Sequence, residues 1–541
     1  MNNYDKHKSM VIHSALWAAA GDALGWITEL TNGNKSIVRT RAGSPYVTEP
    51  VTWKRTIGGR FGPNVTFPAG TYSDDTQLRL AVSRSIRGDG VFDVETFAKV
   101  ELTVWPTYAL GGGIGTKAAA VNLSKRTVNW FSNFYEREGS SYINSGGNGA
   151  AMRVQPHIWA SKALTTQVLT NVFKDSIVTH GHPHGFLGAI FHSYCLSEVI
   201  KQGEVPNPNN WLEYLEYFNG FEDIINADPQ LKDFWLPSWE SHSGKKLFLD
   251  IEKTSKEFRE DIYKVISILS EDPKGYKDVI TALGCDKKEY RGSGLKTALA
   301  ASALAYLFKE KGVESALVEA ANMLDTDTDT IATMTGAILG AVSKERPKWA
   351  LQDSFYIERE AGRLADIAFK IQTETFVYPD LLKWSPPTSQ TLSVGALDDG
   401  LAMAGLGSLK CLKNSYKVGE YVWQWFELPF GQSILAKVKT NPDDMSLLQL
   451  PKMRAQNQQT KNQKSYVQPD SRTQLAMFHS DENTNIDSLD VLTDIVINSN
   501  FDNEVLGRAV NQYIETTSSV ESAIAFIAII SKAKIARMKK K

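Results

Sequence analysis

Apolar residues recur at helical spacing along most of the first 372 residues. Apolar positions three and four residues apart are typical of helices that bury one face. There is no strong alternation of strands with helices and no repeat of fixed period. The pattern therefore predicts a mainly α fold, with a compact all-helical domain over residues 1–372. The segments expected to be helical are 10–20, 76–88, 164–173, 185–200, 212–226, 256–270, 295–310, 314–323, 331–343 and 356–371.

Two stretches break the helical pattern. Residues 207–247 are rich in Trp and punctuated by Pro, and we interpret them as an insertion in the domain. Trp384-Ser-Pro-Pro387 indicates a boundary, because Pro restricts both its own backbone and that of the preceding residue. Residues 418–439 then alternate and carry aromatic and β-branched side chains, which predicts two or three strands. We therefore expect a small β-containing domain over residues 376–450.

The end of the chain has a different composition. Residues 452–472 are rich in Gln, Asn, Lys and Ser, so we expect a flexible linker over residues 451–475. Helical spacing returns from Ile486, which predicts a C-terminal helical extension over residues 476–541. Its basic end, from Lys532 onward, could contact anionic lipid or nucleic acid, although a packed terminal helix is the commoner arrangement. This region is also a candidate surface for a protein partner.

The composition restricts the class of protein. The 541 residues, 42% hydrophobic and 22% charged with a net charge of −2, allow two or more domains and show no basic excess typical of nucleic-acid binding. Cys195, Cys285 and Cys411 are too far apart for a metal or redox motif, so we expect a reducing, cytoplasmic location. The N-terminus lacks the architecture of a signal peptide, and the apolar run at 520–530 is too short to cross a bilayer. We therefore expect no membrane span.

The most informative motif is the acidic segment Asp325–Thr330, in which three Asp alternate with three Thr. These oxygen donors favour a hard divalent cation such as Mg²⁺, Mn²⁺ or Ca²⁺. The alternative is a solvated turn that caps a helix, since Asp and Thr are good N-caps. An EF-hand is excluded because Thr330 stands where that loop needs Gly, and Gly336 stands where it needs Glu.

A second acidic helix start, Ser73–Thr76, precedes an apolar pattern of helical spacing. Asp74 and Asp75 would lie in the first turn of that helix, where the helix dipole favours acidic residues even without a metal. Carboxylates from two separate helix starts can also converge on a pair of metal ions. The residues alone leave both interpretations open.

Five short motifs give the chain a resemblance to the ADP-ribosylglycohydrolase family, which includes the dinitrogenase reductase-activating glycohydrolase. They occur in the order typical of that family, over about residues 10–372, and the resemblance does not extend to residues 373–541. The motifs are Gly21-Asp-Ala-Leu-Gly25 with Glu29, Ser73-Asp-Asp-Thr76, Gly147-Asn-Gly-Ala-Ala-Met-Arg153 followed by Pro156, Thr179-His180 with His182-Pro183, and Asn322 to Ala332 running into Gly336-Ala-Ile-Leu-Gly340.

The resemblance implies a centre of two divalent cations, Mg²⁺ or Mn²⁺. Glu29 stands where the family has an acidic residue at the mouth of the site. We assign the catalytic role to Glu29, Asp75 and Asp327, since carboxylates near the metals can move the protons of a glycosidic cleavage. The metal ligands that the resemblance implies are Ser73, Asp74 and Asp75 on one side and Asp327, Asp329 and Thr330 on the other.

Glycine-rich segments, with neighbouring Arg and His residues, are expected to bind the ligand. Backbone N–H groups of glycine loops can hold a diphosphate, although a glycine cluster alone is more often a plain turn. Arg153 pairs with phosphate or is a buried structural cation. His180 and His182 shape the ligand site by resemblance; the alternative, zinc, needs further ligands. The residues expected to contact the ligand are Gly113, Gly115, Gly147, Asn148, Gly149, Arg153, His180 and His182.

The resemblance implies a hydrolase that cleaves the N- or O-glycosidic bond between ADP-ribose and an acceptor, such as an ADP-ribosylated protein. Asp325 departs from the family, which usually has Gly there, and either adds a carboxylate near the site or changes a turn. The alternatives are a non-catalytic ADP-ribose-binding or structural protein of the same fold, and a hydrolase of free ADP-ribose derivatives. The retained carboxylates favour an active enzyme.

Overall fold

A computed structural model describes residues 2–59, 61–270, 275–451 and 489–538. Helices of all types make up 56% of the described residues, which confirms the mainly α fold. Residues 1–452 form one compact unit and residues 453–541 form a second.

The helices expected in the first 372 residues are confirmed, because every expected segment overlaps an α-helix. The helices that were not predicted are all short, and they are α2, α4, α5, α6, α7, α12 and α14. The α-helices of the first unit are α1 (Asn3–Thr28), α2 (Lys35–Ala42), α3 (Asp74–Ser85), α4 (Val94–Thr96), α5 (Leu102–Val104), α6 (Ile114–Leu123), α7 (Gln155–Trp159), α8 (Thr166–Ile177), α9 (Pro183–Gln202), α10 (Asn210–Tyr214), α11 (Phe221–Asn226), α12 (Leu236–Ser243), α13 (Leu247–Ser270), α14 (Tyr276–Leu283), α15 (Gly294–Phe308), α16 (Val313–Ala321), α17 (Thr328–Val342) and α18 (Ser354–Ala368).

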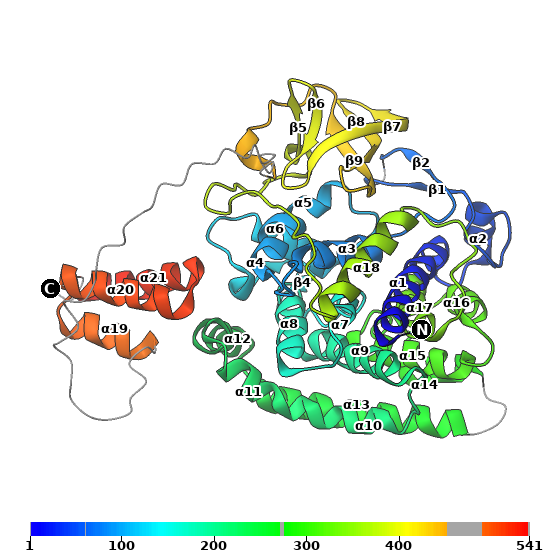
Figure 1. The fold of residues 1–541 in the computed structure, drawn as a ribbon, viewed down its shortest axis with the longest axis horizontal. Coiled ribbons are helices and arrows are strands. Elements are labelled where there is room, and N and C mark those ends of the chain that lie inside the picture. Colours follow the sequence, from blue (N-terminus) through cyan, green and yellow to red (C-terminus); the bar gives the residue numbers. More distant parts are fainter. Residues whose placement is uncertain (1, 60, 271–274, 452–488, 539–541) are drawn as a thin grey trace. The chain divides into compact units, whose positions relative to one another are not determined.

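Helix α1 lies at the core of this unit. It contacts α16, α17 and α18, and Figure 1 shows it beside α17. Every residue of α1 from Ser14 to Thr28 is buried. Among the described helices, α1 alone is long and apolar enough to cross a membrane, and 89% of its apolar stretch is buried inside the protein. Such burial is typical of a core helix.

Glycines bring α1 and α17 to backbone distance. A Cβ atom at Gly21 would lie 2.4 Å from the carbonyl oxygen of Ala332, and one at Gly336 would lie 2.4 Å from that of Trp17. The separation of two packed helices depends on the side chains at their contact, so glycine on both helices permits this approach. The glycines at the contact are Gly21 and Gly25 of α1 and Gly336 and Gly340 of α17.

The two or three strands expected over residues 418–439 are confirmed, and the antiparallel sheet also extends back to residue 394. Its five strands follow one another in the order β5-β6-β7-β8-β9. Strands β5 and β6 were missed because they are short and contain Gly and Ala, which carry little strand propensity. The strands of the sheet are β5 (Val394–Leu397), β6 (Gly400–Met403), β7 (Gly407–Val418), β8 (Tyr421–Glu427) and β9 (Ser433–Lys439).

Two small hairpins precede this sheet, and neither was predicted. The first pairs β1 (Trp53–Thr56) with β2 (Asn64–Phe67), and the second pairs β3 (Glu136–Arg137) with β4 (Ser140–Ser141). Strands of four and two residues are too short to give a period-two pattern.

The sheet β5–β9 packs on the helical part of the first unit. The guanidinium of Arg84 in α3 donates to Oε1 of Gln432, just before β9, at 2.7 Å. The same guanidinium binds both carboxylate oxygens of Glu101, at 2.7 and 2.8 Å. Since the three side chains are buried, the sheet and helices share an interior. The division of this part into separate domains stays a prediction.

Residues 207–247, expected as an insertion, form the short helices α10, α11 and α12 and the start of α13. Two buried tryptophans hold this segment on the rest of the unit. Trp235 Nε1 donates to Tyr142 Oη at 2.8 Å, and Trp239 Nε1 donates to the carbonyl oxygen of Gly181 at 2.6 Å. The segment therefore packs beside residues 142–181.

The second unit consists of α19 (Leu489–Asn498), α20 (Asn503–Thr517) and α21 (Val520–Met538), which confirms the C-terminal helical extension. The three helices contact one another, and the rings of Tyr513 and Phe526 lie 5.3 Å apart in their interior. The linker expected over residues 451–475 lies, apart from Pro451, outside the described residues, as do residues 476–488.

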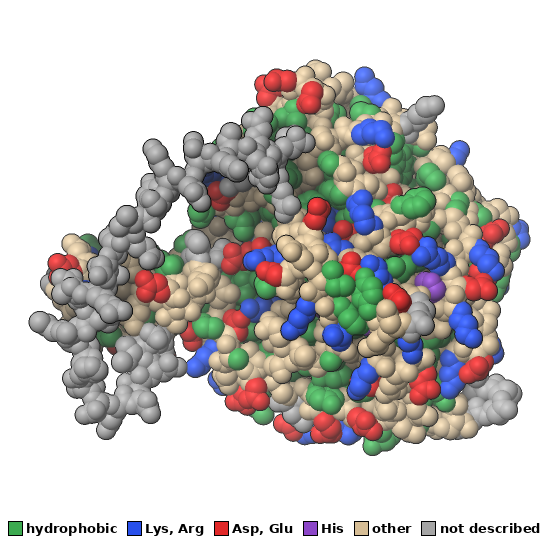
Figure 2. Space-filling view, viewed as in Figure 1, with side chains coloured by type: hydrophobic (Ala, Val, Ile, Leu, Met, Phe, Trp, Pro, Cys, Tyr) green, Lys and Arg blue, Asp and Glu red, His purple; other side chains and the backbone are tan. Residues whose placement is uncertain are grey.

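Charged side chains of both signs are interspersed on the face of the molecule in Figure 2. This distribution agrees with the net charge of −2. A large patch of one sign would be the mark of a surface that attracts a polyanion.

The contact between α1 and α17 predicts that Gly336→Ala destabilises the protein. The new methyl group would overlap the backbone of Trp17, and overpacking of this kind costs about 1–3 kcal/mol or more. We expect a Tm several degrees below that of the natural protein by scanning calorimetry. Gly220→Ala is the matched control, because a Cβ atom there meets nothing within 4 Å. Equal Tm values for the two variants would contradict the role given to the glycine contact.

Candidate metal centre

The start of α3 is held by a buried carboxylate from α1. Asp22 accepts hydrogen bonds from the backbone N–H groups of Ser73 at 2.9 Å and Thr76 at 2.8 Å. Ser73 caps the helix, and its hydroxyl accepts from the N–H of Asp75 at 3.3 Å. Asp22 thus fixes the backbone of the acidic motif. In the sequence, Asp22 is recognisable only as part of the Gly21–Gly25 motif. Nothing there indicates that its carboxylate binds the backbone at the start of α3.

The start of α17 faces the start of α3. The hydroxyl of Thr330 donates to Oδ1 of Asp75 at 3.4 Å, and the N–H of Thr330 donates to Oδ1 of Asp329 at 2.9 Å. The residue before the helix, Asp327, is its N-cap. The two helix starts predicted to converge therefore do so.

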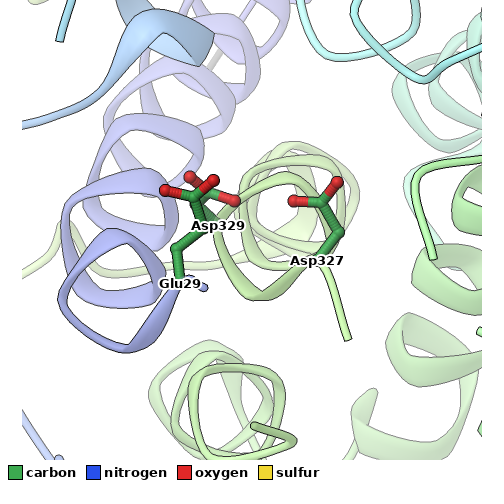
Figure 3. Close-up of side chains that lie close together, drawn as sticks. All are labelled: Glu29, Asp327 and Asp329. Atoms are coloured by element: carbon green, nitrogen blue, oxygen red, sulfur yellow. The ribbon is translucent and has the colours of Figure 1, made fainter. Parts of the chain in front are cut away.

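Glu29 joins this cluster from the end of α1. Oxygen atoms of Glu29, Asp327 and Asp329 all lie within 4.8 Å of one another, and Figure 3 shows the three side chains together. Within the described residues, these three are the potential metal ligands that come together as a group of at least three. The group contains no histidine. The geometry therefore gives no support to the alternative of a zinc site at His180 and His182.

Burial of so many carboxyl groups shifts their protonation. Burial raises the pKa of Glu29 from 4.5 to about 7, and the charge of Asp327 adds to the rise. Burial likewise raises the pKa of Asp74 from 3.8 to about 8, and the charges of Glu29 and Asp22 act in the same direction. The pKa values of Asp75 and Asp329 lie well above the usual range for the same reasons. A cation among these groups would remove the repulsion.

The donor set fits a hard divalent cation. Oδ2 of Asp75 is buried and has no hydrogen-bond partner among the described residues, and a buried polar atom without a partner is rare in a folded protein. All the side chains of the cluster offer oxygen, the donor that Mg²⁺, Mn²⁺ and Ca²⁺ prefer. The residues that would hold such an ion are Glu29, Asp327 and Asp329, whose oxygens lie close together, with Asp74 and Asp75 beside them.

A glycine outside the expected ligand set makes room for Asp74. Gly111 has φ +109°, and a Cβ atom there would lie 2.5 Å from Oδ1 of Asp74. Only glycine can adopt this positive φ and also leave room for the carboxylate of Asp74 without strain. Gly113, two residues on, is the exposed N-cap of α6 with open space around it. Gly115 lies in the first turn, where a Cβ atom would meet the hydroxyl of Ser145 at 2.4 Å.

The loop Gly147–Gly149 lies against the acidic cluster. Nδ2 of Asn148 donates to Oδ2 of Asp327 at 2.8 Å, and its backbone N–H donates to the carbonyl oxygen of Gly292 at 2.9 Å. Gly147 forms an isolated bridge with Ser293. Asn148, expected to contact the ligand, therefore orients Asp327. A Cβ atom at Gly149 would lie 2.9 Å from the ring of His180, so this glycine allows close packing.

Arg153 is a buried structural cation, which is one of the two alternatives that the sequence left open. Its guanidinium binds the carboxylate of Asp175 at 2.8 Å, the carbonyl oxygens of Gly149 and Asp175, and the hydroxyl of Thr179. The side chain is 0% exposed. All three of its nitrogens have protein partners, so its contacts are explained without a phosphate.

His180 and His182 are both uncharged near neutral pH. Burial lowers the pKa of His180 to about 3 and that of His182 to about 4. Nδ1 of His182 accepts from the N–H of His184 at 3.1 Å and caps α9. His180 Nδ1 lies 2.6 Å from the hydroxyl of Thr179. These contacts fix the two rings beside the glycine loop.

Asp325, the departure from the family pattern, is exposed and lies outside the cluster. A Cβ atom at Gly33 would lie 2.8 Å from its Oδ1 atom, so the carboxylate packs against the loop after α1. Asp325 therefore belongs to a turn and is not grouped with the potential metal ligands.

The raised pKa values predict that metal stabilises the protein more at high pH. Between about pH 4 and pH 8 the folded protein keeps protons on Glu29 and Asp74 that the unfolded chain has lost. Without metal, the free energy of unfolding therefore falls as pH rises. A bound cation favours the ionised carboxylates.

We expect Mn²⁺ to raise Tm relative to EDTA by on the order of 5 °C more at pH 8 than at pH 5. Asp74→Asn should reduce this difference, and Asp325→Asn should leave it unchanged. An equal effect of Mn²⁺ at both pH values would argue against metal at this cluster.

A comparison with models of known protein families identifies the family of this chain. A sequence model described as ADP-ribosylglycohydrolase matches residues 5–368. ADP-ribosylhydrolase ARH3 of Gallus gallus is 28% identical over 300 residues, which are 52% of this chain and 72% of that protein. A solved structure, an ADP-ribosylglycohydrolase-related protein complex, covers 67% of this chain and 99% of its own, with 18% identity and a TM-score of 0.43. Because the family match spans more than half of the residues, the chain belongs to the ADP-ribosylglycohydrolase family.

Proposed function

We propose that this chain is a metal-dependent hydrolase that cleaves the glycosidic bond between ADP-ribose and an acceptor, and so reverses ADP-ribosylation. One observation carries the proposal: in a member of this family, the acidic starts of α3 and α17 and the end of α1 meet in a partly buried carboxylate cluster. A non-catalytic relative would have no need to keep so many buried, mutually repelling carboxyl groups.

The chain's own residues suit a glycosidic cleavage. Divalent cations bound at such a cluster supply Lewis-acid stabilisation and a nucleophilic water. Glu29, whose pKa burial raises to about 7 in the metal-free protein, is a carboxyl group close enough to the metals to move the protons of the cleavage. Asp75 and Asp327 are held by Thr330 and Asn148. Once a bound cation keeps these carboxylates ionised, their negative charge would stabilise the positive charge that develops on the ribose during cleavage.

Neighbouring segments can take the rest of ADP-ribose. The first turn of α6, which begins after Gly113, presents N–H groups suited to a diphosphate. A hollow of about 210 Å³ lies beyond it, and Phe134 and His242 stack on its wall with ring centroids 4.6 Å apart. Aromatic walls of this kind stack well on a nucleobase. The residues that line the hollow are Phe134, Tyr135, Glu136, Ser141, Tyr142, Ile143, Asn144, His242 and Ser243.

We also propose that the acceptor is a protein and that the enzyme works in a reducing, cytoplasmic setting. The proposed reducing setting is supported by the cysteines, because Cys195, Cys285 and Cys411 are all free. A partner bound through residues 476–541 remains part of this proposal.

Substitution of the acidic residues tests the function. Asp74→Ala and Asp329→Ala should each lower release of ADP-ribose by at least about 10²-fold, because each removes a carboxylate of the cluster. Release is measured from ADP-ribosyl-arginine and ADP-ribosyl-serine peptides with Mg²⁺, Mn²⁺ or EDTA. Asp325→Ala is the matched control, since this aspartate comes from the same motif but is exposed. Turnover like that of the natural protein in either test variant would defeat the assignment, and binding without release would favour a non-catalytic protein.

Removal of residues 452–541 should leave hydrolysis of a small ADP-ribosyl substrate within about threefold, because the two compact units can act separately. Binding of a protein partner should weaken. Circular dichroism and Tm establish that the shortened chain is folded. Loss of small-substrate turnover in the folded, shortened protein would place the second unit in the active enzyme.

A further inference from the structure

The hairpin β1–β2 brings a cation to the metal centre. Arg55, on β1, places its Nη1 atom 3.5 Å from Oε2 of Glu29, and the two side chains are 23% and 19% exposed. Arg55 Nη1 makes no hydrogen bond within the described residues. Among the described ion pairs, Arg55 is the cation that faces Glu29. Its positive charge counters the repulsion between Glu29 and its neighbours Asp327 and Asp329.

Aromatic contacts fix the hairpin on the end of α1. Trp53 of β1 and Phe67 of β2 are partners in the strand register, and both rings lie 4.9 Å from that of Trp26 in the last turn of α1. The guanidinium of Arg55 lies 5.9 Å from the Trp26 ring. Aromatic pairs at these distances attract beyond the area that they bury. The position of Arg55 therefore depends on the position of the hairpin.

A second arginine ties the backbone after α1. Nη1 of Arg41, in α2, donates to the carbonyl oxygens of Ile27 at 2.9 Å and Glu29 at 2.8 Å. Its guanidinium lies 5.5 Å from the ring of Trp53. The hairpin, α2 and the end of α1 thus form one packed group around Glu29.

The other side of the hairpin rests on the sheet β5–β9, and Figure 1 shows the two beside each other. The N–H of Thr66 donates to the hydroxyl of Tyr416 on β7 at 3.1 Å. The ring of Trp425 on β8 lies 6.4 Å from that of Phe67. A Cβ atom at Gly58 would lie 2.8 Å from the ring of Trp423. This sheet lies beyond residue 368, where the match to the family ends.

We propose that the sheet β5–β9 positions Arg55 against Glu29 through the hairpin β1–β2, which makes Arg55 a positioning residue of the reaction. The path runs from Trp425 through Phe67 and Trp53 to Arg55 and Glu29. The inference rests on the proposed hydrolase function. By this proposal, the sheet β5–β9 contributes to turnover, in addition to any contribution to binding an acceptor.

Arg55 is tested first, in the full-length protein loaded with Mn²⁺. Arg55→Ala should lower kcat by about tenfold or more, with KM changed less than about threefold, because a displaced carboxylate impairs the reacting geometry. Arg55→Lys keeps the charge and should recover most of the loss. A purely structural role would lower Tm and spare kcat of the folded fraction. A natural protein with no turnover would defeat the proposed function, whereas an active Arg55→Ala variant would defeat this inference alone.

The link to the sheet is tested by Trp425→Ala and Tyr416→Phe. Each should lower kcat in the direction of Arg55→Ala, and Trp425→Ala combined with Arg55→Ala should be little worse than Arg55→Ala alone. Tyr421→Phe is the matched control on the same sheet, where the ring contacts Lys437. Mn²⁺ affinity is measured for the same variants, so that the coupling between Trp425 and Arg55 is also tested by a measurement that does not depend on turnover. Additive losses in both kcat and Mn²⁺ affinity, or natural activity in a folded Trp425→Ala variant, would overturn the proposal.

Discussion

Helices α1 and α17 pack at backbone distance, and the positions of the acidic side chains in the centre follow from that contact. The hydroxyl of Thr328 donates to the carbonyl oxygen of Gly25 at 2.9 Å, and that of Thr28 donates to Thr328 at 3.2 Å. Glu29 follows Thr28, while Asp327 and Asp329 flank Thr328. The end of one helix is therefore locked beside the start of the other, and three carboxylates meet because the two backbones do.

In this arrangement, close packing of the helices counteracts the electrostatic repulsion between the carboxyl groups. Carboxyl groups crowded in a buried place repel one another and hold their protons. The dense contact of α1 with its neighbours, and the two backbone hydrogen bonds that Asp22 accepts from the start of α3, keep the groups in place. The interior thus maintains a local charge arrangement that would not form in a loosely packed protein. Sites of this kind trade some stability for chemistry.

The sequence indicated those parts of the site that depend on neighbouring residues. Acidic helix starts can be read locally, so Asp74, Asp75, Asp327 and Asp329 were identified before their positions were known. Contacts between distant segments were not readable, because periodicity reports that a face is buried but not what covers it. Asn148 and Asp327 are 179 residues apart. The hairpin that carries Arg55 is equally hidden, since four-residue strands leave no periodic signal. The same limit left Arg153 with two interpretations until its partner Asp175 was seen.

The pairing of α1 with α17 has a consequence for synthesis of the chain on the ribosome. The two threonines that lock these helices lie 300 positions apart. At about 5–20 residues per second, roughly 15–60 s separate the translation of the two segments. During that interval the apolar α1 is made but lacks the surface that covers it in the finished protein. Nascent chains of this protein should therefore depend on chaperones that shield an N-terminal apolar helix, and ribosome stalling before residue 328 should leave α1 exposed to proteases and to aggregation.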